Sequence, residues 1–360
     1  MFVSMFSMLL ACGEKQEDTA VETETGEDTT AETESEVDET WLYEVGVSTL
    51  AGSGELVSTD GIGEQSSFAE PKALRLRSDG VLVVADSASG NIRLVSPDGT
   101  VQTLDLVGDV PVAPSGLAVT DNAIFVSDYE QHCILKIEGT VSSVFSGVCG
   151  EKGYQNGATA LFENPRGLAI NGEGKLLVAD AGNNAIRSIG LTGEVTTIAG
   201  TAEKFVISSE GPALEANVYI PFGLAIHPDG DLFFSGFDHC IRRLHNGSLE
   251  NVAGLCLNYG NTGTDDGGSI DARFDTPMDI AFTPDGRLLI ADGFNDRIRV
   301  LSADLTTVST LTGQEAGFQD GSLDEALFNI PRSVTVDDNG VIFVADSVNN
   351  RIRVIVEGAE

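Results

Sequence analysis

The side chains best suited to nucleophilic, redox or metal chemistry are five cysteines and four histidines. Four of the cysteines form two pairs with the same separation of sixteen residues, Cys133 with Cys149 and Cys240 with Cys256. A histidine directly precedes the first cysteine of each pair, but a neighbouring Cys–His pair lacks the ligand spacing of a zinc finger. The other two histidines, His227 and His245, lie in turn sequences. The pattern therefore predicts no metal site and no cofactor.

No catalytic motif accompanies these residues. The chain contains neither the Gly-x-Ser-x-Gly sequence of a hydrolase nor a glycine-rich phosphate-binding loop. The stretch Asp265-Asp266-Gly267-Gly268 offers carboxylates without the ligand spacing of a calcium loop. Similar short stretches recur at Asp60-Gly61, Asn156-Gly157 and Asp320-Gly321. We interpret them as a repeated turn and nominate no catalytic residue.

The charge balance excludes one class of partner. The 360 residues include 20 Lys or Arg and 56 Asp or Glu, for a net charge of −36. Nucleic acid is not expected as a partner, because phosphate binding needs a basic face. Direct docking on an anionic membrane is disfavoured for the same reason. Hydrophobic residues make up 41 % of the chain, which is enough to bury a core.

The N-terminal residues indicate where in the cell the protein is located. A short apolar run ends in Leu9-Leu10-Ala11-Cys12, which resembles the lipobox of bacterial lipoproteins, although no Lys or Arg precedes it. The resemblance implies a signal peptide at 1–11, acylation of Cys12 and anchoring in the bacterial cell envelope, with outer-membrane placement as a family-level expectation. The alternative is a chance apolar start.

The segment after this cysteine favours the lipoprotein interpretation. Residues 14–39 hold 12 Asp or Glu and one Lys, so 12–40 should be a disordered acidic linker. Residues 41–360 remain acidic, with 44 acidic and 19 basic side chains.

An internal repeat decides the fold. Three stretches align from a phenylalanine through a proline: 162–170, 274–282 and 328–336. Each is followed by a glycine-containing turn, an apolar run ending in Ala-Asp, and Ile-Arg six residues after the Asp. Less complete copies bring the number of units to six, with anchors at positions 86, 128, 180, 236, 292 and 346. Short runs rich in Val, Ile, Leu and Phe, separated by Gly, Pro, Asn and Asp, predict strands.

This pattern resembles the NHL repeat over nearly all of residues 47–356. The resemblance implies an all-β, six-bladed propeller with four strands per blade. The single tryptophan lies outside the repeats, which argues against the WD type.

The order of the repeat elements predicts how the ring closes. A fourth-strand copy at Val47–Gly52 precedes the first complete unit, whereas the last unit ends at Arg353-Val354-Ile355 with no fourth strand after it. The N-terminal strand should therefore complete the last blade, which removes the exposed strand edges.

The same alignment predicts two disulfides. In each cysteine pair the first member begins the third strand and the second follows the fourth, and these strands are antiparallel neighbours within disulfide reach. Cys133–Cys149 and Cys240–Cys256 should therefore each close a short loop on the outer edge of one blade, each stabilising by roughly 3 kcal/mol. Disulfides agree with an oxidising compartment.

Recurring polar residues are interpreted as structural. We expect hairpin pairs, not catalysts, at Asp86/Arg93, Asp180/Arg187, Asp292/Arg299 and Asp346/Arg353. The fourth unit keeps Arg242 but has Gly236 at the Asp position, so Arg242 needs another partner or faces solvent.

Residues that differ between repeats are the better candidates for function. The residue after the repeated proline begins the innermost strand, near the mouth of the central channel; around the ring these are Lys72, Ser115, Arg166, Phe222, Met278 and Arg332. Three bases in so acidic a protein are compatible with an anion-binding mouth. The structural alternative is that they pair with the adjacent strand-end aspartates.

Two functions remain open at this point. The first is a non-catalytic, envelope-anchored, monomeric propeller that binds a protein, peptide or glycan on one face and touches the membrane only through its lipid. The alternative is a metal-dependent enzyme of the lactonase or lyase kind, with its site at the central channel. Fold alone does not separate them.

Overall fold

The computed structural model describes residues 43–204, 207–256 and 261–358. The lipobox cysteine Cys12, the signal-like run and the acidic segment lie outside the described residues. The helices among the described residues are single 3-10 turns, η1 (Gly63–Gln65), η2 (Ala181–Asn183) and η3 (Gly293–Asn295). None of these turns has the length and apolarity needed to cross a bilayer.

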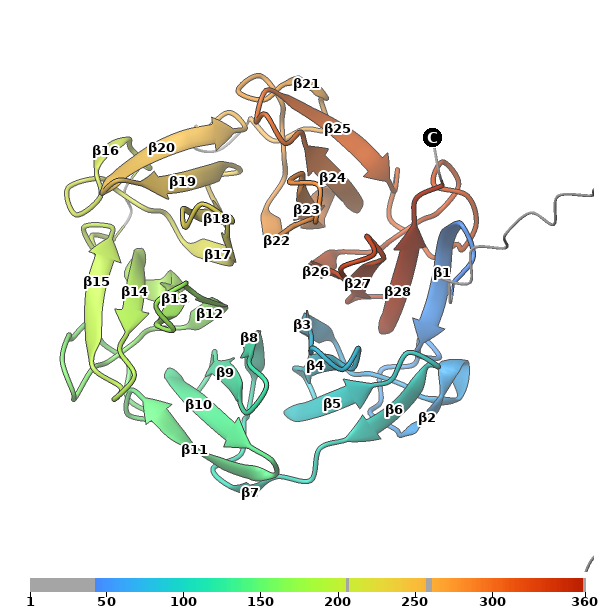
Figure 1. The fold of residues 1–360 in the computed structure, drawn as a ribbon, viewed down its shortest axis with the longest axis horizontal. Helices are drawn as coiled ribbons and strands as arrows, with labels where there is room; N and C mark the ends of the chain where they lie inside the picture. The colour runs from blue at the N-terminus through green and yellow to red at the C-terminus, as the bar shows by residue number, and fades with distance from the viewer. Residues whose placement is uncertain (1–42, 205–206, 257–260, 359–360) are drawn as a thin grey trace, which may run out of the picture. The chain divides into compact units, whose positions relative to one another are not determined.

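Six sheets stand as blades around a central axis, which confirms the predicted all-β propeller (Figure 1). We number the blades along the chain and give their strands from the axis outward. Blade 1 contains β3 (Pro71–Leu76), β4 (Leu82–Asp86), β5 (Asn91–Val95), β6 (Thr100–Thr103) and β2 (Gly61–Ile62). Blade 2 contains β8 (Pro114–Val119), β9 (Ile124–Asp128), β10 (Cys133–Glu138), β11 (Val141–Ser146) and β7 (Val107–Gly108). Blade 3 contains β12 (Pro165–Ile170), β13 (Leu176–Asp180), β14 (Ala185–Ile189) and β15 (Val195–Ala199).

The second half of the ring repeats this order. Blade 4 contains β17 (Pro221–Ile226), β18 (Leu232–Gly236), β19 (Ile241–His245), β20 (Ser248–Ala253) and β16 (Gly211–Pro212). Blade 5 contains β22 (Pro277–Phe282), β23 (Leu288–Asp292), β24 (Arg297–Leu301), β25 (Thr307–Thr312) and β21 (Gly267–Gly268). Blade 6 contains β26 (Pro331–Val336), β27 (Ile342–Asp346), β28 (Arg351–Val356) and β1 (Gly46–Ala51). Four blades thus carry a two-residue fifth strand, where the repeat pattern predicted four strands only.

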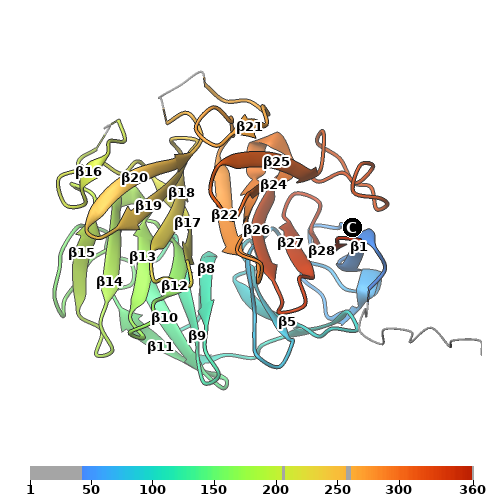
Figure 2. The same ribbon diagram turned by 45° about the horizontal axis from the view of Figure 1, so that its top comes forward.

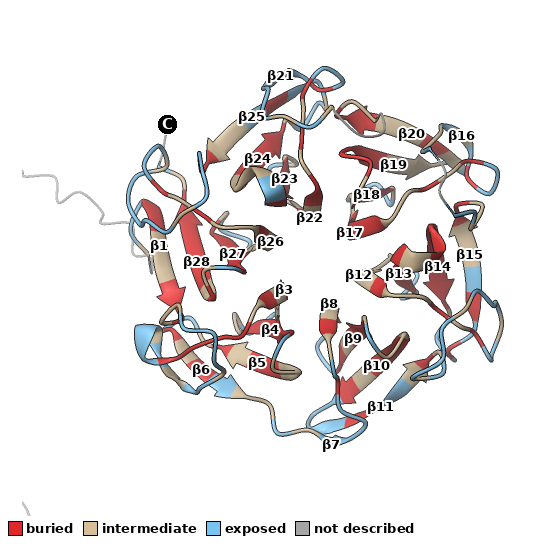
Figure 3. Cartoon of the chain, turned by 180° about the vertical axis from the view of Figure 1, so that it is seen from behind, coloured by how far each residue is buried: buried red, intermediate tan, exposed pale blue. Residues whose placement is uncertain are grey.

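The core lies between blades. The second strand of a blade has both faces covered, so its residues form a continuous apolar run; all five residues of β23 are buried (Figure 3). One apolar cluster joins Leu74 and Val84 of blade 1 to Phe343 and Val354 of blade 6. Because each blade buries its faces against its neighbours, no blade has a complete core of its own.

The ring is closed by the N-terminal strand, as predicted. β1 pairs with β28 in antiparallel register, from Gly46 opposite Val356 to Ala51 opposite Ile352, so the first strand completes the last blade (Figures 1 and 2). Val47 and Ala51 are buried in the clusters on the two sides of this blade. The closure removes the unpaired edge that β28 would otherwise present.

Buried Arg–Asp ion pairs recur in four blades, which confirms the predicted hairpin pairs. Nη–Oδ distances are 3.3 Å in blade 1, 2.6 Å in blade 3, 2.9 Å in blade 5 and 2.8 Å in blade 6, and all eight side chains are fully buried. The other Nη of each arginine donates to a carbonyl of the loop that enters the blade, at 2.7–3.0 Å. The repeated Asp/Asn-Gly turns lie in these loops and also accept from the arginine, as Asn156 does from Arg187 at 2.8 Å. Each arginine therefore ties an outer loop to the middle of its sheet.

The two blades that lack this pair carry the disulfides. Blade 2 has Leu135 at the arginine position, and blade 4 has Gly236 at the aspartate position. The predicted Cys133–Cys149 and Cys240–Cys256 bonds are present in these blades, with Cα–Cα distances of 5.1 and 5.3 Å.

Arg242 of blade 4 is buried and has found other partners. It donates to the carbonyl oxygens of Asn217 and Ser209. The Asp238 carboxylate takes the space that a side chain at Gly236 would fill, 2.7 Å from the position of its Cβ, and attracts the arginine. In blade 4 the aspartate that attracts the buried arginine therefore lies two residues later in the sequence than in the other blades.

A second repeated contact joins neighbouring blades. At five of the six junctions, a residue with a left-handed backbone conformation forms this contact. Its side chain accepts a hydrogen bond from the backbone N–H of the residue that precedes the next blade's proline. The acceptor–donor pairs, at 2.8–3.1 Å, are His132–Asn164, Asn184–Ile220, His239–Thr276, Asp296–Ile330 and Asn350–Glu70. Blade 1 has Gly90 at this position. His132 and His239 thus serve as blade-to-blade staples.

The closing strand gives a matched pair of substitutions. Val47 is 3 % exposed and Val45 is 69 % exposed. Val47→Asp should lower the free energy of unfolding by several kcal/mol, because it buries an unpaired carboxylate in the seam. Val45→Asp should change it by less than about 0.5 kcal/mol. Urea unfolding followed by circular dichroism measures both, and equal effects would contradict a seam that holds the ring.

The His239 staple predicts a pH dependence. Burial lowers the pKa of His239, against the opposing pull of the Asp275 and Asp238 carboxylates, so the folded protein favours the neutral imidazole that accepts from Thr276. This stabilisation is fully present above the usual histidine pKa of about 6.5, and it is lost as the pH falls from there through the lower folded-state pKa. His239→Asn keeps an acceptor, as at Asn184 and Asn350, and should remove this part of the acid destabilisation. Unfolding free energies from pH 5 to 8 test this; a variant with the wild-type pH profile would refute it.

Candidate functional site

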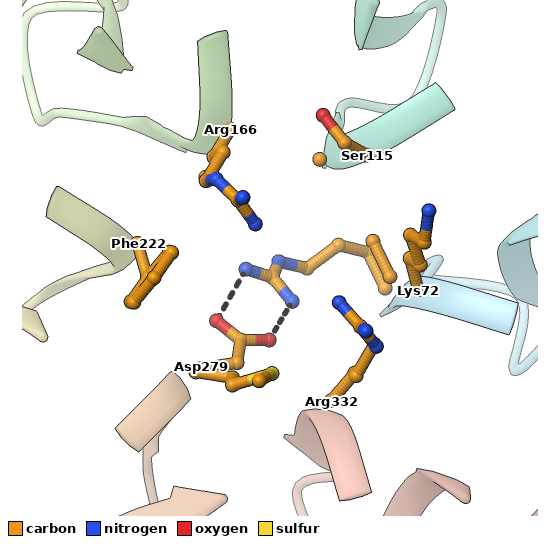
Figure 4. Close-up of a pocket in the computed structure, with 12 residues that line it drawn as sticks. Lys72, Ser115, Arg166, Phe222, Asp279 and Arg332 are labelled. Atoms are coloured by element: carbon orange, nitrogen blue, oxygen red, sulfur yellow. Dashed lines mark hydrogen bonds and ion pairs between the residues drawn. The ribbon is translucent and has the colours of Figure 1, made fainter. Parts of the chain in front are cut away.

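The mouth of the central channel is built by the starts of the six innermost strands. Each strand begins with a proline, which has no N–H to leave unpaired, and the residue after it lies at the channel. All six residues predicted from the repeat line one cavity of about 40 Å³, enough for roughly three water molecules (Figure 4). We call the propeller face that carries this opening the mouth face.

The three predicted bases are brought together here. Burial lowers the pKa values of Lys72, Arg166 and Arg332, and repulsion from the Arg332 charge lowers those of the other two further. Glu70 provides a counter-charge, 3.6 Å from the Lys72 ammonium. The Nε atoms of Arg166 and Arg332 are buried with no hydrogen-bond partner among the described residues. The mouth therefore holds clustered positive charge with incompletely satisfied donors.

Among the described residues, no ion pair joins these three bases to the adjacent strand-end aspartates. Asp86, Asp180 and Asp346 are held within their blades by the buried arginines Arg93, Arg187 and Arg353.

The other three predicted residues have distinct surroundings. The Ser115 hydroxyl donates to the carbonyl of Pro165 in the next blade at 2.9 Å. Met278 packs against Gly293, where a Cβ would lie 2.9 Å from the methionine Cγ. Phe222 is buried, and its ring lies 4.6 Å from the Arg166 guanidinium. Ser115 and Met278 thus shape the mouth, whereas the ring of Phe222 packs against the Arg166 guanidinium.

The floor of the mouth is an ion pair that crosses the channel, and sequence reasoning missed it. Arg75 of blade 1 donates from both Nη atoms to Asp279 of blade 5, at 2.8 and 3.2 Å (Figure 4). The Ser333 hydroxyl of blade 6 also donates to Asp279, and Arg75 bonds the carbonyl of Leu74 at 2.8 Å. Three blades are therefore joined across the axis.

The repeat alignment contained the signal for this pair. Four residues after the proline, the other five blades have Ala118, Ala169, Ala225, Ala281 and Thr335 where blade 1 has Arg75. Two residues after the proline, the others have Ala73, Gly116, Gly167, Gly223 and Ser333 where blade 5 has Asp279. Small residues are needed there; a Cβ on Gly167 would lie 2.2 Å from the Phe222 carbonyl oxygen.

Beyond this floor the channel changes character. A hollow of about 320 Å³ on the far side of Arg75 is lined almost wholly by small and apolar side chains of the innermost strands. The ion pair thus separates a cationic mouth from an apolar exit.

The donor set does not fit a metal. Among the described residues there is no cluster of three or more His, Cys, Asp or Glu side chains able to hold a metal ion. The mouth lining offers one carboxylate, Asp279, and Arg75 already occupies it.

Comparison with known proteins agrees with this architecture. The last repeat, residues 328–355, matches the family model of the NHL repeat. The chain is similar to SUPPRESSOR OF QUENCHING 1, a chloroplastic protein of Arabidopsis thaliana, with 27 % identity over 316 residues that cover 67 % of this chain and 30 % of that protein. It is also similar to NHL repeat-containing protein 2 of Gallus gallus, with 26 % identity over 280 residues that cover 68 % of this chain and 38 % of that protein. The chain thus spans well under half the length of these relatives.

Solved structures share the fold. An auxiliary nutrient-binding protein from Bacteroides thetaiotaomicron has a TM-score of 0.68 at 18 % identity, covering 86 % of this chain and 76 % of that one. Virginiamycin B lyase from Staphylococcus aureus has a TM-score of 0.53 at 14 % identity, covering 86 % and 99 %. The same architecture therefore serves a binding protein and an enzyme, and at these identities the likeness shows the fold alone.

The cross-channel pair can be tested by a double-mutant cycle. Asp279→Gly leaves the Arg75 guanidinium without its partner and should cost about 2–4 kcal/mol of unfolding free energy. Arg75→Ala combined with Asp279→Gly restores the residue types of the other blades. The double variant should lose less than the sum of the single losses, by about 1–3 kcal/mol. Additive losses in urea unfolding would show that the pair is not coupled.

Proposed function

We propose that this propeller is a binding protein of the bacterial cell envelope that holds an acidic ligand at the mouth of its central channel. The observation that supports this most is the cluster of Lys72, Arg166 and Arg332 around one small cavity, where burial lowers the pKa of all three cations. Clustered like charges repel one another, and an anionic ligand that accepts hydrogen bonds from these cations would relieve that repulsion.

The size of the cavity sets what enters it. About 40 Å³ admits a carboxylate group but not a whole metabolite, so the body of the ligand would lie on the mouth face. The protein around the site is strongly acidic, with 44 acidic and 19 basic residues from position 41 onward. The negative field of the whole propeller opposes the approach of any anion, so the affinity of the ligand must come from short-range contacts with the cations of the mouth.

Binding is favoured over catalysis by the chemistry of the lining. The mouth contains guanidinium, ammonium, hydroxyl, thioether and phenyl groups, and the one carboxylate is engaged by Arg75. These groups recognise an anion, and among the described residues they provide no metal-ligand set. The metal-dependent lactonase or lyase alternative has no residue cluster among the described ones in its favour.

The envelope location rests on three supports. The lipobox-like Leu9-Leu10-Ala11-Cys12 would supply a lipid anchor at Cys12, and residues 12–40 would form an acidic tether to a monomeric propeller. The two disulfides agree with an oxidising compartment. A fold neighbour from Bacteroides is described as an auxiliary nutrient-binding protein.

A thermal-shift titration with succinate at constant ionic strength tests the proposal. Wild-type protein should be stabilised in proportion to occupancy, by about 2.7 kcal/mol at a hundred times the Kd. Arg332→Gln should abolish most of this shift. Lys175→Gln removes an exposed cation from the opposite face and should leave the shift intact. Equal shifts in both variants, or none in the wild type, would count against an anion site at the mouth.

A further inference from the structure

A second hollow adjoins the mouth on the same face. It has a volume of about 350 Å³ and lies over blades 2, 3 and 4. Two of its lining residues, Arg166 and Phe222, also line the mouth cavity, so the two hollows share a wall. We call this second hollow the aromatic pocket, because four of its lining side chains are Tyr129, Tyr219, Phe222 and Phe237.

The aromatic wall is preorganised. Phe237 meets Tyr219 and Phe222 edge to face, with ring centroids 6.0 and 6.2 Å apart. Such pairs fix the ring orientations and leave apolar surface toward the hollow. Phe237 and Tyr219 are only partly buried, so part of each ring remains open to a ligand. This wall suits the apolar face of one small ring.

The polar wall provides one cation, Arg166, that forms no ion pair with a carboxylate among the described residues; its side-chain hydrogen bond is to Tyr129, which lines the same pocket. The Arg166 guanidinium lies between two rings, 4.9 Å from the centroid of Tyr129 and 4.6 Å from that of Phe222. The stacking holds its plane in place, and its buried Nε has no partner among the described residues. Lys204, at the rim, is already bound to Glu163 at 2.7 Å.

The two asparagines of the lining are similarly committed. Asn164 donates to the Tyr129 carbonyl at 2.9 Å, and Asn184 donates to the Glu203 carbonyl and accepts from Ile220. Arg166 is therefore the group of this pocket best placed to recognise a carboxylate.

We propose that the aromatic pocket binds a six-membered sugar ring carrying a carboxylate, a uronate residue of an acidic oligosaccharide. The ring lies against Phe237 and Tyr219, and its carboxylate accepts from Arg166. The neighbouring uronate directs its carboxylate into the mouth, toward Lys72 and Arg332. This assignment rests on the proposed function, because it names the ligand class of the same cationic mouth.

A repeating ring-and-charge polymer fits the two hollows better than a peptide does. The pocket volume is at the lower end of the range for small-molecule sites, which suits one ring. The Arg166 guanidinium lines both hollows and therefore connects the ring site to the anion site. A polymer that carries one charge on each ring can place a ring in one hollow and a charge in the other.

Calorimetric titration with trigalacturonate separates this inference from the proposed function. Wild-type protein should bind trigalacturonate at least tenfold more tightly than succinate, and a neutral trigalactose should not bind measurably. Phe237→Ala should weaken trigalacturonate binding about tenfold and leave succinate binding unchanged. Phe294→Ala, which removes an exposed ring from the equivalent loop of blade 5, is the matched control and should bind as the wild type does.

Each other outcome decides against one of the two statements. If Phe237→Ala binds trigalacturonate as the wild type does, or if a Glu-Tyr-Glu peptide binds more tightly, the uronate assignment is wrong while the anion site at the mouth stands. If Arg332→Gln alters the binding of neither succinate nor trigalacturonate, the mouth itself is not the site.

Discussion

The fold depends on the pairing of the first strand with the last. A blade has no complete core of its own, since its apolar faces are buried only against the two neighbouring blades. A ring left open between blades 6 and 1 would expose the edge of β28 and loosen the clusters on both sides. β1 prevents this by joining residues 46–51 to residues 352–356, so the two ends of the described propeller stabilise each other. Every site on the face, including the channel mouth, depends on this closure for its geometry.

Within the blades, two different kinds of bond stabilise the third strand. Four blades tie the incoming loop to the third strand through a buried arginine that also pairs with the strand-end aspartate. The blades in which that pair is incomplete are the two with a disulfide between the third strand and the segment after the fourth. In blade 2 the interval between anchors is 42 residues, against 52–56 in later blades, so the incoming loop is short and Leu135 joins the apolar core instead. A covalent bond that closes a sixteen-residue interval is a physically sufficient substitute for the missing ion pair.

The functional candidates lie where the repeat varies. Positions that maintain the blades recur around the ring, because the same geometry makes the same demand six times. The residue after each proline faces the channel, where its type differs from blade to blade, and there the chain carries three cations. Arg75 and Asp279 also differ from the residues at the equivalent positions of the other blades. The two residues depend on each other, because either charge alone would be unpaired at the axis. A six-fold scaffold thus acquires an asymmetric site by substitutions in single blades.

The sequence alone determined the repeat architecture, the strand that closes the ring, both disulfides and the set of residues at the channel mouth. These follow from local periodicity and from fixed offsets within each unit, which strand pairing converts directly into neighbours in space. The tertiary structure alone decided which partners the mouth cations have, the cross-channel pair between blades 1 and 5, the histidine staples and the aromatic pocket beside Arg166. Those contacts join side chains of different blades, and their distances depend on the radius and closure of the whole ring, which no single repeat encodes.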